Sequence, residues 1–207
     1  ELFETINANY ASKVLEDMSY DNAVDIMNHL SKQKIVSLLT LMNQEDSKEI
    51  KALLHYEEDT AGGIMTTEYI SLKSTMPVRE ALLQVKEQAP DAETIYMIYA
   101  INDDKQLVGV LSLRDLITAE NDAYIEDVMQ ERVISVNVAD DQEDVAQKMR
   151  DYDFIAIPVL DYQDHLLGII TIDDILDVMD EEASEDYSRL AGVSDVDATN
   201  TSIVKTS

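Results

Sequence analysis

Acidic side chains are concentrated in one stretch near the end of the 207-residue sequence. At helical spacing, Asp174, Asp177, Glu181 and Glu185 share one face of a helix. Like charges at this spacing destabilise a helix by a few tenths of a kcal/mol per pair. Eight of the fourteen residues from 173 to 186 are acidic: Asp173, Asp174, Asp177, Asp180, Glu181, Glu182, Glu185 and Asp186.

A small dication would relieve this repulsion. Two carboxylates about 4 Å apart repel by about 1 kcal/mol in water and about 4 kcal/mol near a protein surface. Mg²⁺ prefers oxygen ligands and keeps several of its waters, so few protein ligands are enough and the affinity stays weak. The stretch therefore predicts regulatory Mg²⁺ binding; the alternative is a solvated acidic surface.

The charge of the whole sequence excludes several partners. The net charge is −28, from 15 basic and 43 acidic residues, so we expect neither nucleic acid nor direct lipid binding. The sequence lacks cysteine, which excludes disulfides and thiolate metal sites. The most apolar stretches, Ile155–Leu160 and Leu166–Ile172, have strand length and are too short to span a membrane. Since the sequence begins at Glu1 and shows no signal peptide, we expect a soluble fragment.

Catalytic motifs are missing from the sequence. It contains neither a G-x-x-x-x-G-K-[ST] loop nor a G-x-G-x-x-G loop, and it has no His/Cys cluster. His29, His55 and His165 are isolated from one another in the sequence. We therefore expect no enzymatic activity.

The first 56 residues show only helical periodicity. Apolar residues recur three and four positions apart, which gives each unit one buried stripe. Glu57–Gly63 (EEDTAGG) follows and is typical of a linker, because two glycines end helical order. Short stacked helices are expected over Tyr10–Met18, Tyr20–Leu30, Lys32–Met42 and Gln44–Leu54.

The remainder is an internal duplication. Ile64-Met65-Thr66 aligns with Val128-Met129-Gln130, and Gly109–Asp115 aligns with Gly168–Asp174. The two offsets differ, which places an insertion in the first copy near Gln88–Thr94. Each copy predicts the order β-α-β-β-α. The expected elements are Tyr69–Leu72, Val78–Glu87, Tyr96–Ile101, Leu107–Ser112 and a helix from Leu113, then Val133–Val136, Gln142–Tyr152, Phe154–Leu160, Leu166–Ile172 and a helix from Asp173.

This repeated unit, ending in Gly-apolar-apolar-Ser/Thr-apolar-x-Asp, resembles the CBS domain, and two units in tandem resemble a Bateman module. The resemblance covers residues 64–181. Further motifs are Tyr56-Glu-Glu-Asp-Thr-Ala-Gly-Gly-Ile-Met65, Ala89-Pro-Asp-Ala-Glu-Thr-Ile-Tyr96 and the segment Asp177–Val193. With the helical region upstream, they make the chain similar to the cytosolic part of the MgtE magnesium transporter family.

The resemblance implies an α+β architecture: a small α-superhelical domain, a tandem CBS pair and a C-terminal connecting helix. The expected domains are residues 1–56 (helical domain), 57–63 (linker), 64–122 and 123–181 (CBS copies), and 182–207 (plug helix and tail). It also implies a homodimer formed through the CBS domains, a transmembrane pore in the same polypeptide, and a location on the cytoplasmic face of the bacterial inner membrane. In this interpretation, Mg²⁺ bridges acidic faces, compacts the domains and closes the pore, and low Mg²⁺ releases them.

By family motif, the predicted metal ligands come from all parts of the chain. Alternatives remain open for several of them: Asp21 as solvated surface, Asp141 as a helix cap and Asp174 as a helix N-terminal charge. The predicted metal residues are Asp21, Asp25, Gly63 (through its carbonyl), Asp141, Asp153, Asp174, Asp177, Glu182, Glu185 and Asp186.

Two further hypotheses compete with magnesium sensing. Ser112, Asp115, Thr171 and Asp174 occupy positions where CBS domains that bind ATP or AMP contact ribose and phosphate. Arg114 and Asp173 depart from that pattern, and the acidic field repels phosphates. A purely structural dimerisation module is the other alternative, but it does not account for the acidic stripe.

Overall fold

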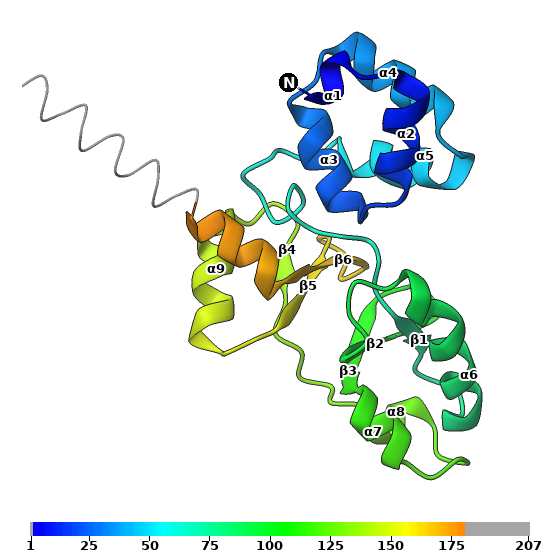
Figure 1. The fold of residues 1–207 in the computed structure, drawn as a ribbon. Coiled ribbons are helices and arrows are strands. Elements are labelled where there is room, and N and C mark those ends of the chain that lie inside the picture. Colours follow the sequence, from blue (N-terminus) through cyan, green and yellow to red (C-terminus); the bar gives the residue numbers. More distant parts are fainter. Residues whose placement is uncertain (1, 181–207) are drawn as a thin grey trace, which may run out of the picture.

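The computed structural model describes residues 2–180, which form a helical domain and two CBS copies (Figure 1). The four helices expected in the first domain are confirmed within a few residues. An additional short helix, α1, was not predicted, because four residues are too few to show a period. The helices are α1 Leu2–Thr5, α2 Ala8–Glu16, α3 Tyr20–Asn28, α4 Lys32–Leu41 and α5 Gln44–Leu53.

Polar side chains fix where three of these helices begin. In the first turn of α2, Asn9 N and Tyr10 N donate to the side chain of Asn7. Lys34 N donates to Ser31 Oγ at the start of α4, and Glu45 N and Asp46 N donate to Asn43 Oδ1 at the start of α5. Such caps satisfy amides that have no partner within the helix. The exception is α3, whose N-cap residue Ser19 makes no side-chain cap.

Each CBS copy is built on a three-stranded sheet with one parallel and one antiparallel pair. The first sheet has the order β1-β2-β3 and the second β4-β5-β6. A helix over residues 172–180 follows β6. The elements are β1 Ser71–Lys73, α6 Val78–Gln88, the 3-10 turn η1 Ala89–Asp91, β2 Met97–Ile101, β3 Leu107–Ser112, α7 Leu113–Thr118, α8 Ile125–Val128, β4 Val136–Asn137, α9 Gln142–Asp151, β5 Ala156–Leu160 and β6 Leu166–Thr171.

The first strand of each copy differs from the prediction. The sequence predicts Tyr69–Leu72 and Val133–Val136, but the paired residues are Ser71–Lys73 and Val136–Asn137. Both are short strands at the edge of their sheet, and only the residues beside β2 or β5 form backbone hydrogen bonds with it. The apolar run alone therefore places them a few residues too early. The insertion predicted in the first copy contains η1.

The two copies exchange their leading residues. Thr66, at the start of the first copy, pairs with Ile169 of β6, and Gln130, at the start of the second, pairs with Val110 of β3. In each pair, both backbone amides donate to the partner's carbonyl oxygen, at N···O distances of 2.8–3.0 Å. The exchange depends on close approach at a glycine. A Cβ added at Gly168 would lie 2.6 Å from the carbonyl oxygen of Thr66.

The hydrophobic core unites the helical domain with the second CBS copy. One cluster contains residues of both, such as Leu15 and Met27 of the helical domain and Val145 and Ile157 of the second copy. The first copy has a separate cluster around Ile98 and Leu116. The pocket described below therefore lies between parts that share a core.

The segment expected as a linker, residues 57–63, is bonded to the second copy. Ala61 N donates to Asp140 O at 2.8 Å, and Gly62 N donates to Val138 O at 2.9 Å. Ala61 is fully buried. None of the helices within residues 2–180 has the length and apolar character needed to cross a membrane.

Candidate functional site: an acidic pocket between the helical domain and the CBS pair

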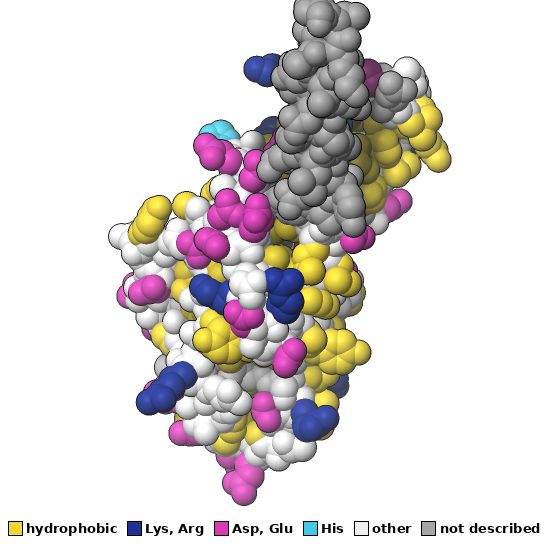
Figure 2. Space-filling model, turned by 90° about the vertical axis from the view of Figure 1, so that its left-hand side faces the viewer, with side chains coloured by type: hydrophobic (Ala, Val, Ile, Leu, Met, Phe, Trp, Pro, Cys, Tyr) yellow, Lys and Arg dark blue, Asp and Glu magenta, His cyan; other side chains and the backbone are white. Residues whose placement is uncertain are grey.

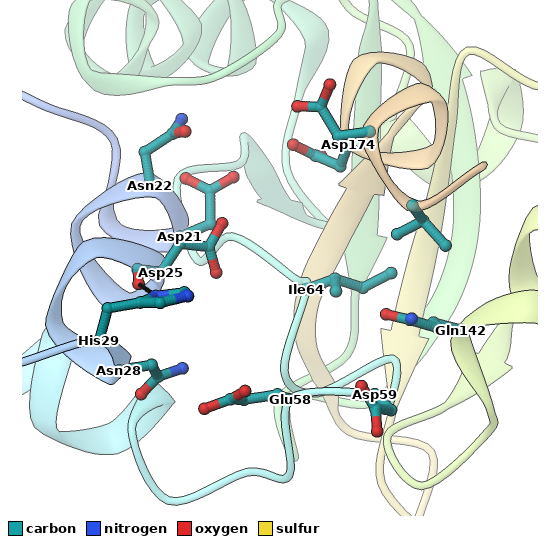
Figure 3. A pocket seen from close by; sticks show the side chains of 12 residues that line it. Asp21, Asn22, Asp25, Asn28, His29, Glu58, Asp59, Ile64, Gln142 and Asp174 are labelled. Atoms are coloured by element: carbon teal, nitrogen blue, oxygen red, sulfur yellow. Dashed lines mark hydrogen bonds between the residues drawn. The ribbon is translucent and has the colours of Figure 1, made fainter. Parts of the chain in front are cut away.

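A pocket of about 180 Å³ separates α3 from the second CBS copy. Figure 3 shows Asp21 and Asp25 of α3 on one side and Asp174, from the helix after β6, on the other. Three parts of the chain therefore supply its acids. The lining residues are Asp21, Asn22, Asp25, Asn28, His29, Glu58, Asp59, Ile64, Gln142, Asp174, Asp177 and Val178.

Asp21 is the most deeply buried acid of the pocket. It lies in the first turn of α3, and only 6% of its surface is exposed. Its Oδ1 is buried without a hydrogen-bond partner among the described residues. A buried polar atom without a partner is costly, and more so when it carries charge. This oxygen therefore marks a place where a cation or a water would be stabilising.

Asp174 faces Asp21 from the second CBS copy (Figure 3). Its Oδ2 accepts from Thr171 N at 2.9 Å and from Thr171 Oγ1 at 2.5 Å, so it helps to begin the helix over residues 172–180. Burial raises the pKa of Asp174 to about 7, against the lowering effect of these hydrogen bonds. The charges of Asp21 and Asp173 raise it further.

A second acidic pair adjoins this pocket and links the helical domain to the first copy. Glu68 Oε2 accepts from Tyr20 N, at the start of α3, at 3.0 Å. Glu68 thus supplies from another domain the cap that Ser19 does not provide. Burial, with the charges of Asp21 and Glu93, raises the pKa of Glu68 despite this bond. The pKa of Glu93 is also raised, by partial burial and by the charges of Asp21 and Asp173.

Four predicted metal residues meet in the pocket: Asp21, Asp25, Asp174 and Asp177. Gly63 is not part of the lining, although the next residue, Ile64, is.

Two other predicted metal residues lie elsewhere. Asp141 is the N-cap of α9 and accepts from Glu143 N at 2.8 Å, as in the helix-cap alternative. Asp153 is exposed at the turn after α9, with a φ of 53°. The remaining predictions, Glu182, Glu185 and Asp186, and the plug helix to which they belong, lie outside the described residues.

The sequence reasoning missed several residues of the pocket. Glu58 and Asp59 fall in the segment predicted as a linker, and His29 is one of the isolated histidines for which the sequence predicts no ligand role. Glu58 and Asp59 are two acids next to the Gly-Gly pair, which was a usable signal. His29 lies four residues after Asp25 and eight after Asp21, so its helical spacing was a second signal.

The donor set of the pocket fits a hard cation. It is dominated by carboxylate and amide oxygens, the ligands that Mg²⁺ prefers. Within residues 2–180, no three Asp, Glu, His or Cys side chains are already arranged to hold one metal ion. An ion that keeps several waters does not require three. The fit rests on the unpartnered oxygen of Asp21.

The residues predicted to contact nucleotide form two equivalent helix starts. In the first copy, Asp115 Oδ2 accepts from Ser112 N at 2.9 Å and from Ser112 Oγ at 2.6 Å. These bonds lower the pKa of Asp115, helped by the charge of Arg114. Thr171 and Asp174 form the corresponding pair in the second copy.

The surface agrees with the charge of the sequence. On the face drawn in Figure 2, acidic side chains are more frequent than lysine and arginine. Among residues 2–180, ion pairs at the surface are few, such as the exposed pair of Lys73 with Asp103 at 2.7 Å. Most of the negative charge among the described residues is therefore not neutralised by neighbouring basic side chains.

Comparison with known proteins identifies the parts of this fold. The model of the MgtE intracellular N domain matches residues 1–59, and the CBS-domain model matches residues 61–122 and 125–181. The chain belongs to the MgtE family. The magnesium transporter MgtE of Enterococcus faecalis is 60% identical over 149 residues, which cover 72% of this chain and 33% of that protein. MgtE of Thermus thermophilus is 43% identical over 178 residues, which cover 84% of this chain and 40% of that protein.

Solved structures of parts of a magnesium transporter and of a Mg²⁺ channel share the fold. The crystal structure of the soluble part of a magnesium transporter superposes with a TM-score of 0.82 at 54% identity, covering 86% of this chain and 70% of that one. The cytosolic domain of the Mg²⁺ channel MgtE in complex with ATP gives a TM-score of 0.67 at 35% identity, covering 86% and 82%. The expected α+β architecture is confirmed. The chain spans 33–40% of the length of the curated relatives, which are named as magnesium transporters.

Proposed function

We propose that this chain is the magnesium-sensing region of an MgtE-type magnesium transporter, on the cytoplasmic side of the membrane. One observation carries the proposal. A buried carboxylate oxygen of Asp21 has no hydrogen-bond partner among residues 2–180, and Asp21 faces Asp174 across the boundary between two domains. Such an arrangement is unfavourable without a cation. It is what a switch between a compact and a released helical domain requires.

The residues that would hold Mg²⁺ are Asp21 and Asp25 from α3 and Asp174 and Asp177 from the helix after β6. The bound ion would supply the positive charge that these four carboxylates lack. Asp21 is buried and Asp174 is partly buried, while Asp25 and Asp177 are exposed.

Regulation follows because the ligands come from two parts of the chain, α3 and the helix after β6. Only the compact arrangement brings α3 next to the second CBS copy, so the compact state binds the ion more tightly and the ion shifts the population towards it. Without the ion, Asp21 and Asp174 repel, and the helical domain is released. In the whole transporter, the segment that follows residue 180 would pass this change to the pore.

Small-angle scattering and thermal unfolding test the proposal. With millimolar MgCl₂, we expect a smaller radius of gyration and a higher Tm than in NaCl of equal ionic strength, because screening alone does not bridge carboxylates. The change Asp21→Asn should abolish the difference. Asp104→Asn, which removes an exposed acid in a turn of the first copy, is the matched control and should keep it. Equal behaviour in both salts would refute the proposal.

A second ligand is favoured by one relative. Since the cytosolic domain of an MgtE channel has been crystallised with ATP, we also propose that this chain binds an adenine nucleotide. Ser112 and Asp115 of the first copy are the best placed, because the equivalent Asp174 lies in the acidic pocket. Calorimetry with ATP should show binding that is weakened by Asp115→Ala. No heat of binding with the unchanged chain would exclude this second function.

A homodimer through the CBS pair is the third part of the proposal. Large apolar side chains are exposed on or beside its helices: Leu83 of α6 is 60% exposed, Ile117 of α7 is 62% and Tyr124 is 47%. Burying such residues against a second copy would be stabilising. Light scattering should give twice the mass of one chain, and the change Ile117→Asp should reduce the measured mass to that of a single chain.

A further inference from the structure

His29 closes the row of polar side chains that α3 presents to the pocket. Asp21, Asp25 and His29 follow at intervals of four residues, so they lie above one another on one helix face. His29 is the C-cap of α3 and is exposed. Figure 3 shows its ring directed into the pocket beside Asp25.

A backbone contact fixes which nitrogen of the ring carries the proton. His29 Nδ1 lies 2.8 Å from the carbonyl oxygen of Asp25. A carbonyl oxygen only accepts, so Nδ1 must be the donor. In the neutral ring, Nε2 then keeps its lone pair and is available to a ligand. This is the arrangement typical of histidines that bind metals, whose second nitrogen donates to a carbonyl or carboxylate.

The surroundings of His29 favour a cation rather than another donor. Glu58 and Asp59 lie on the opposite wall of the same pocket. Asp21, one helix turn beyond Asp25, has its buried Oδ1 without a partner among residues 2–180. This orphaned oxygen is independent of the histidine and points to a positively charged occupant.

We propose that the pocket also binds a first-row transition-metal dication, with Nε2 of His29 and the carboxylate of Asp25 as ligands. The inference rests on the proposed function, since it assigns a second class of ion to the same pocket. Imidazole suits Zn²⁺, Cu²⁺, Ni²⁺ and Fe²⁺, whereas Mg²⁺ prefers oxygen. Waters complete the coordination. Such an ion would compact the domains at a lower concentration than Mg²⁺ does.

Zinc and magnesium titrations of two histidine variants of the 207-residue chain test this assignment. In His29→Asn, the amide can still donate to the Asp25 carbonyl, but the side chain has no nitrogen lone pair. We expect its Zn²⁺ affinity to fall by about tenfold or more, since even outer partners of metal ligands are worth about 10–100-fold. Its Mg²⁺ affinity should fall much less. His55→Asn removes an exposed imidazole outside the pocket and should change neither.

Electron spin-echo modulation with Mn²⁺ as the probe detects the nitrogen directly. The unchanged chain and His55→Asn should show a coupled imidazole nitrogen, and His29→Asn should lose it. Unchanged Zn²⁺ affinity in His29→Asn, or a nitrogen signal that persists there, would overturn the inference. These results are separate from those for the proposed function, which fails if Mg²⁺ does not compact the unchanged chain, whatever His29 does with Zn²⁺.

Discussion

In both CBS copies an aspartate caps the start of the last helix, but the pKa of this aspartate is shifted in opposite directions. Asp115 accepts from the amide and hydroxyl of Ser112, and Asp174 accepts from the amide and hydroxyl of Thr171, at nearly equal distances. Yet the pKa of Asp115 is lowered, whereas that of Asp174 is raised to about 7.

The cause of the difference lies outside the motif. Asp174 is covered by α3, which also brings the charge of Asp21, while Asp115 has Arg114 beside it. The same pattern, a Ser or Thr followed three residues later by Asp, is therefore only a helix cap in the first copy. In the second copy its Asp also faces the helical domain. Duplication supplied two equivalent helix starts, and the helical domain adds its own acids beside one of them.

The largest effect is expected from neutralising the acid in each copy. Asp174→Asn removes a buried charge and should stabilise the Mg²⁺-free chain at pH 7.5 by about 1–3 kcal/mol, while reducing the rise of Tm with MgCl₂. Asp115→Asn should instead destabilise by about 1 kcal/mol, as the loss of a good cap does, and leave the Mg²⁺ response intact. Thermal unfolding of both variants with and without MgCl₂ measures this. Equal behaviour would show that the copies do not differ.

The stability of the folded chain should depend on pH in the direction set by the raised pKa of Asp174. Its folded pKa of about 7 exceeds an unfolded value of about 3.9, so the folded chain binds more protons between these values. Stability is therefore lost as the pH rises from about 4 to about 7 and gained as it falls. From pH 7.5 to 5.5 without divalent ions, we expect a gain of up to about 2 kcal/mol.

The raised pKa values of Glu68 and Glu93 act in the same direction. Denaturant unfolding at a series of pH values measures the gain. In Asp174→Asn, most of it should vanish. A stability that rises with pH in this range would contradict the assignment.

The exchanged residues offer a structural comparison of the copies. A Cβ at Gly168 would meet the backbone oxygen of Thr66 at 2.6 Å, whereas at Gly109 it would first meet the flexible side chain of Met129, at 2.4 Å. Gly168→Ala should therefore cost about 1–2 kcal/mol and Gly109→Ala less, because a side chain moves more easily than a backbone. Urea unfolding decides the order, and the reverse order would show that Met129 cannot move.

The smallest effect concerns the link between α3 and the first copy. Glu68→Ala removes the cap on Tyr20 N and should cost about 1 kcal/mol. Glu68→Gln keeps an oxygen acceptor and loses the charge, so its cost should be smaller. Hydrogen exchange of the first amides of α3 should be faster in the alanine variant alone. Equal protection in all three proteins would mean that Glu68 does not hold this helix.

Local patterns predicted the elements well where the sequence itself carries the signal. Leu107–Ser112 is β3 as expected, and α6 extends the predicted helix by one residue. Asp21, Asp25, Asp174 and Asp177 meet in one pocket, a juxtaposition that came from the family resemblance and not from spacing, since they lie far apart in the chain. The ligand roles themselves remain a prediction.

What the sequence did not predict depends on contacts between distant segments. Thr66 pairs with Ile169 of β6, about a hundred positions along the chain, and Gln130 pairs with Val110 of β3, about twenty positions back. No periodicity in the sequence indicates these pairings. The cap that Glu68 provides for α3 also has no signal in the sequence, because Glu68 and Tyr20 are 48 positions apart.

The exchange of leading residues makes the CBS pair a single folding unit. A polypeptide ending after the first copy would lack Gln130 beside β3, and one starting at the second would lack Thr66 beside β6. Each would expose backbone amides and carbonyls that can pair with a strand of another chain. Half-pairs should consequently associate with each other or aggregate.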